Sequence, residues 1–458
     1  MLRFVLGTAL LAVAATPLAA QNRIDGQAPN APALSAYGSY AVGVRQFDLV
    51  NRNQIDVAAI DPTGTGELPR YDRPLTVEMW YPAATDSIGA TSFNTYLRDG
   101  VTEVTLEGRA IRNAAPPKES NPFPLVVVSH GYPGNRFLLS HLAENLASKG
   151  YVVASIDHTD STYRDQRAFA STLVNRPLDQ RFVLDEMARL NADAGSDFAG
   201  LIDTDNTGLI GYSMGGYGAI VSAGGGLSES AMRLGPRDTL AIHREGSETH
   251  DALPDPRIKT AVAIGPWGMN VGLWDAEGLA GIEIPMLFIA GSNDRTSGYD
   301  NGIRKIWEGA TGVDRALLTF EGGGHNTVGP IPAPVESYAA GVSGHYTDPV
   351  WDTVFMNNVG QHFVTAWMDL ELKGDSTMQR YLDLQQNGSD GVWSVDENGA
   401  FRDDHTYWLG FPEGAAEGLS YEVLDAQVAP VPLPASVWLL GLSVAGLGAL
   451  RSRRKGKA

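Results

Sequence analysis

A glycine-rich segment around Ser213 is the sequence feature that most limits how this chain can fold. Residues 208–218 read Gly-Leu-Ile-Gly-Tyr-Ser-Met-Gly-Gly-Tyr-Gly, a short apolar run followed by the pattern Gly-x-Ser-x-Gly. Glycines two positions before and after the serine let a strand turn sharply into a helix, because side chains there would collide with neighbouring backbone. The segment therefore predicts a strand–turn–helix that presents the Ser213 hydroxyl at its tip. Such a short pattern also arises by chance in a chain with 52 glycines among 458 residues. The surrounding sequence must therefore decide whether Ser213 is a nucleophile.

Two partners that would make this hydroxyl nucleophilic follow strand-like runs further along the chain. A serine needs a base to accept its proton and an acid to orient that base. The apolar run 285–290 leads into a loop that carries Asp294, and the run 315–320 leads into Gly-Gly-Gly-His, which ends at His325. The chain order serine, aspartate, histidine is that of the α/β-hydrolase fold. We therefore predict a catalytic triad of Ser213, Asp294 and His325.

A loop upstream of the serine is predicted to complete an oxyanion hole. The buried-strand run 124–129 continues into His-Gly-Tyr-Pro-Gly at 130–134. In this fold, one backbone N–H of that loop and the N–H of the residue after the nucleophile hold the oxyanion. We assign these two donors to Tyr132 and Met214.

The other polar residues near this edge of the predicted sheet are expected to have lesser roles. His130 is expected to hydrogen-bond the loop rather than to react. Asp157, His158 and Asp160 follow the next strand; they could replace the acid or contact substrate, but solvation in a loop is the simpler interpretation. The remaining histidines show no metal-ligand spacing, so neither a metal nor a cofactor is expected.

The apolar runs predict an α/β architecture with a mostly parallel, doubly wound sheet. Continuous apolar runs suit strands covered on both faces, and alternating runs suit an antiparallel leading pair. Continuous runs lie at 125–129, 151–156, 209–212, 260–264, 286–290 and 316–320, alternating runs at 41–49 and 75–81, and helical patterns at 137–149, 178–190, 215–222 and 352–372. This is the pattern of an α/β-hydrolase fold with its site at the carboxyl ends of the strands.

The rest of the chain divides into an insertion, an extension and two targeting segments. We predict a catalytic domain over 41–382, with a lid-like insertion at 223–257 whose Gly-Gly-Gly run could act as a hinge. Residues 21–40 are expected to form a loop segment. Residues 383–430 are rich in Gly, Asn, Asp and Pro, which favours an extension and linker. Residues 1–20 have a basic start, an apolar core and small residues, as a signal peptide has, so we expect export.

The last segment, 431–458, has a tripartite pattern. It begins Val-Pro-Leu-Pro-Ala, continues as a short apolar stretch and ends in a basic cluster. This resembles the PEP-CTERM-like sorting signals of Gram-negative bacteria, in their VPLPA variant. The resemblance implies an exosortase-type processing enzyme as a partner and delivery to the cell surface or outside. Membrane contact through the hydrophobic segment would be transient, or permanent if the segment is a plain transmembrane tail anchor.

Composition excludes several classes of function. The chain has no cysteine, so it has no disulfide framework, no thiolate nucleophile and no cysteine metal site. Its formal net charge is −19 at pH 7, which would repel the phosphates of nucleic acid.

Three segments resemble bacterial relatives of platelet-activating-factor acetylhydrolase, often described as predicted dienelactone hydrolases. They are Glu-Met-Trp-Tyr-Pro at 78–82, Val-Ser-His-Gly-Tyr at 128–132 and Leu-Ala-Ser-Lys-Gly-Tyr-Val-Val-Ala-Ser-Ile-Asp-His at 146–158. The similarity spans roughly residues 40–370 and implies a serine carboxylic ester hydrolase. True dienelactone hydrolases use a cysteine nucleophile, which this chain lacks, so the family name does not give the substrate.

A second resemblance, to cutinase-like polyester hydrolases, rests on 211–216, 129–132 and 265–267. In that family an aromatic pair grips the acyl part of the substrate, which implies Tyr132 and Trp267 here. The usual disulfides cannot form in this chain, and a lid would narrow access for a polymer. Small or medium acyl esters are therefore favoured, with a polyester hydrolase, a lipase, an amidase and a non-catalytic surface-displayed binding protein as alternatives.

Overall fold

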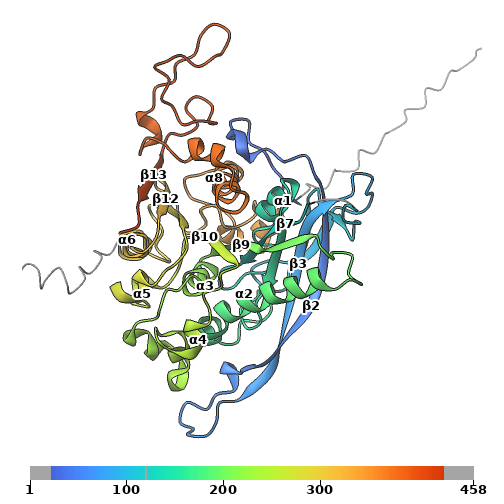
Figure 1. Ribbon diagram of the computed structural model, residues 1–458, viewed down its shortest axis with the longest axis vertical. Helices are drawn as coiled ribbons and strands as arrows, with labels where there is room; N and C mark the ends of the chain where they lie inside the picture. Colours follow the sequence, from blue (N-terminus) through green and yellow to red (C-terminus); the bar gives the residue numbers. More distant parts are fainter. Residues whose placement is uncertain (1–21, 119–120, 428–458) are drawn as a thin grey trace, which may run out of the picture.

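The computed structural model describes residues 22–118 and 121–427, which fold around one large mixed sheet (Figure 1). Among these residues the sheet has ten strands, in the order β13-β12-β11-β10-β9-β7-β8-β3-β2-β6. The strands are β2 (Ala41–Ile55), β3 (Arg70–Ala83), β6 (Ile111–Arg112), β7 (Phe123–Ser129), β8 (Val152–Asp157), β9 (Ile202–Tyr212), β10 (Ile258–Ile264), β11 (Met286–Gly291), β12 (Arg315–Phe320) and β13 (Leu419–Leu424).

The centre of the sheet is parallel, and antiparallel pairs flank it. All neighbouring pairs from β8 to β12 run parallel. The long pair β2 and β3 runs antiparallel and joins the centre through β8. This arrangement confirms the predicted α/β-hydrolase fold, including the antiparallel leading pair.

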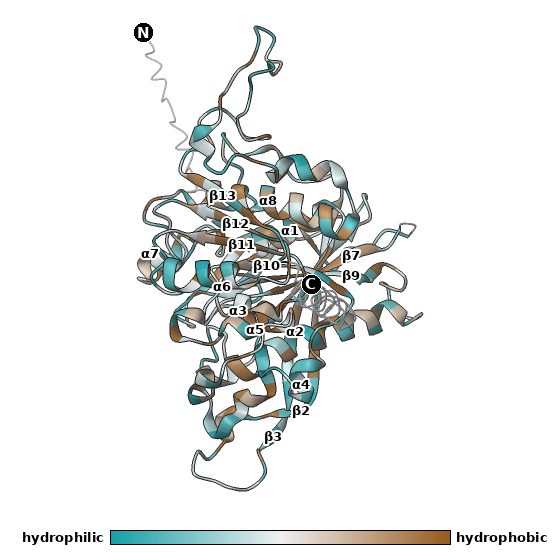
Figure 2. Cartoon of the chain, turned by 60° about the vertical axis from the view of Figure 1, so that its left-hand side comes forward, coloured by the Kyte–Doolittle hydropathy of each residue, from teal (hydrophilic) through white to brown (hydrophobic). Residues whose placement is uncertain are grey.

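Helices cover both faces, as the side-chain alternation of the strands requires. In β7, Val126 and Val128 pack into the core beneath α1 and α8, whereas Leu125 and Val127 pack into the core beneath α2, α3, α5 and α6. The helices are α1 (Ser140–Ser148), α2 (Phe169–Ala192), α3 (Met214–Ser222), α4 (Glu248–Asp251), α5 (Ala276–Ala280), α6 (Arg304–Gly309), α7 (Glu336–Ala339) and α8 (Thr353–Lys373). Figure 2 shows the apolar strands enclosed between these layers.

Helix α2 begins at Phe169, nine residues before the predicted start at 178. Pro177 therefore lies inside the helix and not before it. A proline cannot donate to the carbonyl four residues earlier. That carbonyl, on Leu173, accepts from the Tyr217 hydroxyl of α3 at 2.7 Å instead. The next carbonyl, on Val174, accepts from Nε2 of His243 at 2.7 Å. Tertiary donors therefore satisfy the two carbonyls at the proline, and the helix continues through it.

The prediction of a lid at 223–257 is wrong. None of the residues that line the cavity beside Ser213 comes from this insertion. Helix α3 starts at the carboxyl edge of the sheet and runs back, so a segment that follows it starts at the opposite edge. The insertion packs along the α2–α3 layer, where Ala231 and Leu240 are fully buried in the same core.

The prediction of a linker at 383–430 is wrong for most of that segment. Strand β13 pairs antiparallel with β12 and forms an edge of the main sheet. Before it, Trp408 and Phe411 are buried against Phe363 of α8. The catalytic domain therefore extends beyond 382, because this irregular segment supplies part of the core.

A second, three-stranded sheet has the order β1-β5-β4, with β1 at Asn22–Arg23, β4 at Ser92–Tyr96 and β5 at Glu103–Glu107. The predicted signal peptide and the VPLPA-type segment lie outside the described residues. Within 22–118 and 121–427, we find no helix long and apolar enough to cross a membrane.

Trp408→Ala is expected to lower the free energy of unfolding by about 3–5 kcal/mol, because it opens a cavity between α8 and β13. The indole is 1% exposed and donates to the carbonyl of Gln385 at 2.8 Å. Urea denaturation followed by circular dichroism measures the change. The control is Val392→Ala at a side chain that is 50% exposed, where a change within about 0.5 kcal/mol is expected. A Trp408→Ala protein as stable as this control would show that the segment is not part of the core.

Candidate active site

Ser213 lies at the tip of a sharp turn between β9 and α3. Its backbone has φ 54° and ψ −111°, a conformation that L-residues avoid and that is held only by surrounding structure. The glycines make this turn possible. A Cβ on Gly211 would lie 2.2 Å from the carbonyl oxygen of Gly215, and a Cβ on Gly215 would lie 1.9 Å from that of Ser129. Both distances are impossible contacts, so the turn requires glycine at each position.

The structure brings the hydroxyl, imidazole and carboxylate into one hydrogen-bonded chain. Nε2 of His325 lies 2.9 Å from Oγ of Ser213, and Nδ1 of His325 lies 2.8 Å from Oδ2 of Asp294. Oδ1 of Asp294 accepts from the backbone N–H groups of Thr296 and Ser297, at 2.8 and 2.9 Å. A carboxylate fixed in this way accepts the Nδ1 proton, which leaves the lone pair of Nε2 facing the serine.

Neighbouring strand ends supply the three groups. Ser213 follows β9, Asp294 follows β11 and His325 follows β12, and the register pairs Tyr212 with Ile264 of β10 and Gly291 with Phe320. The Asp294 side chain is 1% exposed, and the imidazole of His325 is 18% exposed. The carboxylate is thus shielded from water, while the imidazole borders the cavity.

The two predicted oxyanion donors lie on either side of the serine. A Cβ on Gly131 would lie 3.2 Å from Cβ of Ser213, so the 130–134 loop runs directly against the turn. Met214 is the first residue of α3, where a backbone N–H has no partner within the helix. Neither the N–H of Tyr132 nor that of Met214 has an acceptor among the described residues. Two backbone donors are therefore available beside the hydroxyl.

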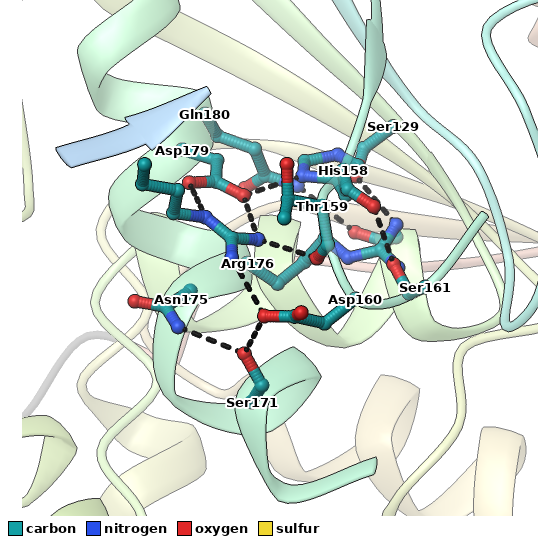
Figure 3. A network of polar contacts seen from close by, with 12 residues as sticks. Ser129, His158, Thr159, Asp160, Ser161, Ser171, Asn175, Arg176, Asp179 and Gln180 are labelled. Carbon is teal, nitrogen blue, oxygen red and sulfur yellow. Dashed lines mark hydrogen bonds and ion pairs between the residues drawn. The ribbon is translucent and has the colours of Figure 1, made fainter. Parts of the chain in front are cut away.

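A second Ser-His-Asp arrangement lies buried beneath this loop (Figure 3). The hydroxyl of Ser129 donates to Nε2 of His158 at 2.9 Å, and Nδ1 of His158 donates to Asp179 at 2.9 Å. Arg73 donates twice to the same carboxylate, at 2.8 and 2.9 Å. These side chains are at most 1% exposed. Desolvation, and then the charges of Arg176 and Arg73, hold the pKa of His158 well below its usual range, so its imidazole is neutral. The burial of all these side chains closes the arrangement to substrate.

The buried arrangement holds the oxyanion loop in place. Arg176 donates to the carbonyl of His130 and, at 2.8 Å, to the hydroxyl of Ser161. Nδ1 of His130 donates to the carbonyl of Gly131 at 2.6 Å, and its Nε2 accepts from the N–H of His158 at 3.3 Å. His130 therefore hydrogen-bonds the loop, as its sequence position predicts.

The expectation that Asp157, His158 and Asp160 are solvated in a loop is wrong. Asp157 accepts from the backbone N–H and the guanidinium of Arg136. Asp160 accepts from Arg73 at 3.1 Å, and His158 belongs to the buried arrangement. Their partners come from distant positions in the sequence, so the local pattern could not reveal their burial.

A cavity of about 410 Å3 opens beside Ser213 and His325. One wall is the oxyanion loop, and the other is the long connection between β12 and α8. Its lining residues are Arg98, Gly131, Tyr132, Pro133, Tyr212, Ser213, Thr296, Gly324, His325, Asn326, Gly344, His345, Thr347, Asp348 and Pro349. The contributions of Arg98 and of 344–349 are unexpected from the sequence, because these residues follow no strand of the predicted parallel sheet. No group of three or more metal-ligand side chains is found in the described parts of the chain.

The predicted aromatic pair is separated by a third ring. Tyr132 lines the cavity, whereas Trp267 does not. The ring of Phe169, the first residue of α2, lies between them, with centroids 5.2 Å from Tyr132 and 5.3 Å from Trp267, edge to face in both cases. Trp267 nevertheless adjoins the nucleophile, because its backbone N–H donates to the carbonyl of Ser213 at 3.2 Å. Phe169 was not expected from the sequence.

Comparisons with known proteins point to ester hydrolases. The family described as PET hydrolase-like matches residues 112–245, which include the oxyanion loop and the turn at Ser213. The chain is similar to cutinases. It is 26% identical over 210 residues to cutinase 2 from Thermobifida cellulosilytica, covering 46% of this chain and 63% of that protein. It is 26% identical over 210 residues to cutinase cut1 from Thermobifida fusca, covering 46% of this chain and 51% of that protein.

The chain thus spans 63% or less of the length of these two curated relatives. Among solved structures, a ferulic acid esterase from Streptomyces cinnamoneus is 23% identical, with a TM-score of 0.48, and the match covers 78% of this chain and 94% of that one. The more specific resemblance to platelet-activating-factor acetylhydrolase relatives stays a prediction.

Ser129→Ala is expected to loosen the oxyanion loop, because it leaves Nε2 of His158 without its hydroxyl donor. A buried acceptor without a partner costs about 1–3 kcal/mol in stability. Hydrogen exchange followed by mass spectrometry should show faster exchange at residues 130–134, and urea denaturation should show the lost stability. The control is Ser376→Ala, at an exposed serine. Unchanged exchange in the loop would mean that the buried arrangement does not hold it.

Proposed function

We propose that the protein is an exported serine carboxylic ester hydrolase that acts on small or medium acyl esters. The observation that carries this proposal is the hydrogen-bonded chain Ser213–His325–Asp294, with two backbone N–H groups beside the hydroxyl that have no acceptor in the described part of the chain. The similarity to cutinases and to the PET hydrolase-like family supports ester hydrolysis. The bordering cavity of about 410 Å3 suits a small or medium substrate.

The geometry supports an acyl-enzyme mechanism in two halves. In the first, Oγ of Ser213 attacks the ester carbonyl while Nε2 of His325 accepts the hydroxyl proton. Asp294 stabilises the resulting imidazolium, and the N–H groups of Tyr132 and Met214 hold the oxyanion. The ester C–O bond then breaks, and His325 returns the proton to the departing alcohol. In the second half, a water molecule attacks the acyl group by the same route and releases the acid and free Ser213.

We also propose that the protein leaves the cytoplasm. The support is the signal-peptide pattern at 1–20 and the VPLPA-type pattern at 431–458. In this proposal an exosortase-type enzyme processes the second segment. The mature enzyme then acts at or beyond the cell surface.

Replacement of the proposed nucleophile tests the activity. Ser213→Ala should abolish hydrolysis of p-nitrophenyl acetate while the melting temperature stays within a few degrees. Asp294→Asn should lower kcat by about 10⁴-fold, because the imidazole then takes the wrong tautomer. The matched control is Asp300→Asn, an exposed aspartate on the same connection, which should keep its activity. Near-normal hydrolysis by Ser213→Ala would refute the assignment.

A fluorophosphonate probe distinguishes the enzyme from a surface-displayed binding protein with the same fold. The wild-type chain should be labelled at Ser213, since the probe needs an activated hydroxyl. A protein that only binds should not react.

A polyester hydrolase is the second candidate, favoured by the PET hydrolase-like match and by the aromatic residues Tyr132 and Trp267: the first lines the cavity, and the backbone N–H of the second donates to the carbonyl of Ser213. The ring of Phe169 stands against it, because it fills the space between these two rings. An aromatic unit of a polymer could lie between them only if Phe169 moved. Phe169 is 38% exposed and is the first residue of its helix, so its removal would cost little packing.

Phe169→Ala is expected to increase activity on bulky aromatic esters. The ratio of kcat/KM for bis(2-hydroxyethyl) terephthalate to that for p-nitrophenyl acetate should rise by about tenfold or more, a typical effect of reshaping an apolar pocket. Liquid chromatography of the released acid measures the first rate and absorbance the second. Phe401→Ala, at a ring 54% exposed on the C-terminal extension, is the control. An unchanged ratio would mean that Phe169 does not limit the site.

A further inference from the structure

Arg98 brings a positive charge into the cavity from an unexpected part of the chain. It lies on the turn between β4 and β5, in the small sheet, and it lines the same cavity as Ser213 and His325. Its backbone N–H donates to the hydroxyl of Tyr346 at 3.1 Å. This bond ties the turn to the connection between β12 and α8, and thereby fixes where the Arg98 side chain begins.

The guanidinium of Arg98 has no hydrogen bond and no ion pair among the described residues. The carboxylates near it are engaged elsewhere. Asp348, on the cavity wall, accepts from the N–H groups of Gly324 at 2.6 Å and of Val350 at 2.9 Å. Asp99 accepts from the N–H and the hydroxyl of Thr102. Both carboxylates therefore hold their own loops, and in the described part of the chain neither forms an ion pair with the guanidinium of Arg98.

The charge of Arg98 acts on both walls of the cavity. Burial, and then the charge of Arg98, lowers the pKa of His345 to about 3, so that imidazole is neutral and pairs with the hydroxyl of Tyr163 at 2.9 Å. On the other wall, burial raises the pKa of Tyr132, and the charge of Arg98 opposes that rise. Arg98, Tyr132 and Ser213 line the same cavity, so a substrate held by the oxyanion loop lies in the cavity that Arg98 borders.

We propose that Arg98 binds a carboxylate of the substrate, so that the site prefers half-esters of dicarboxylic acids to neutral diesters. This inference rests on the proposed ester hydrolysis. A guanidinium binds a carboxylate through two parallel charge-assisted hydrogen bonds, which fix orientation as well as position. Water then cleaves the single ester bond of the half-ester, giving one alcohol and the dicarboxylate, and the carboxylate held by Arg98 takes no part in bond making.

The test compares monomethyl adipate with dimethyl adipate, which share one acyl chain and differ in one charge. Rates are measured at pH 8 by titration of the released acid, where the free carboxyl of the half-ester is ionised. In the wild-type full chain, kcat/KM should be about 10–100-fold higher for the half-ester, the range expected of a hydrogen bond to a charged group. Arg98→Gln should remove this preference by lowering kcat/KM far more for the half-ester than for dimethyl adipate, and Arg98→Lys should restore part of it.

A control and a second measurement separate binding from structural support. Arg164→Gln alters an arginine whose guanidinium lies 4.2 Å from the ring centroid of Tyr96 in the same small sheet, outside the cavity lining. It should keep the preference. Adipate itself should inhibit hydrolysis of dimethyl adipate, with an inhibition constant that rises at least tenfold in Arg98→Gln. An equal fall of kcat/KM for both esters in Arg98→Gln would mean that Arg98 only supports the turn, and would overturn the inference.

The outcome also separates this inference from the proposed function. Dimethyl adipate hydrolysed by wild type with no preference for the half-ester would overturn the inference alone. Hydrolysis of neither ester, with no fluorophosphonate labelling of Ser213, would overturn both.

Discussion

The hydrogen bond between His325 and Ser213 is the interaction on which the whole arrangement depends. It joins groups 112 residues apart at 2.9 Å, so it can form only if β9, β10, β11 and β12 keep their parallel register. Parallel strands place all their carboxyl ends at one edge, where loops can carry different groups to one point. The core of the sheet is thus what positions the site. The backbone strain of this arrangement lies at Ser213, which keeps a positive φ. The close approach of the backbone at the glycines on both sides of the turn holds this conformation in place.

The buried polar arrangement under the oxyanion loop keeps that loop rigid. Backbone donors work only when their loop is rigid, because preorganisation is what makes an oxyanion hole effective. Buried charges cost less when they are paired and hydrogen-bonded. Here Asp179 accepts from Arg73 and His158, and Arg176 ends on the carbonyl of His130, so two strands and a helix hold one loop. The likeness of Ser129–His158–Asp179 to the triad beside the cavity is one of geometry, since its side chains are at most 1% exposed and substrate cannot reach them.

The local pattern of the sequence predicted the parallel sheet and the three residues Ser213, Asp294 and His325. Apolar runs predicted β7 to β12, because buried parallel strands need continuous apolar residues, and the glycines around Ser213 marked the turn. The errors concern long-range partners. Strand β13 is recognisable only by its pairing with β12, and the direction of α3, rather than the composition of 223–257, decides that the insertion lies away from the cavity. Phe169 and Arg98 reach the site through tertiary packing, for which a single sequence has no periodic signal.

One side of the cavity is aromatic and the other is positively charged, which limits the substrates that can bind. On one side Tyr132 lines the cavity, and the rings of Phe169 and Trp267 pack behind it, edge to face, outside the cavity lining. Toward the β4–β5 turn lies Arg98, whose guanidinium has no hydrogen-bond or ion-pair partner among residues 22–118 and 121–427. Desolvating such a charge against an apolar ligand would cost free energy, whereas a carboxylate compensates it. A molecule with an ester beside Ser213 and an anionic group toward Arg98 matches this arrangement, whereas a neutral polymer would leave the guanidinium without a charged partner.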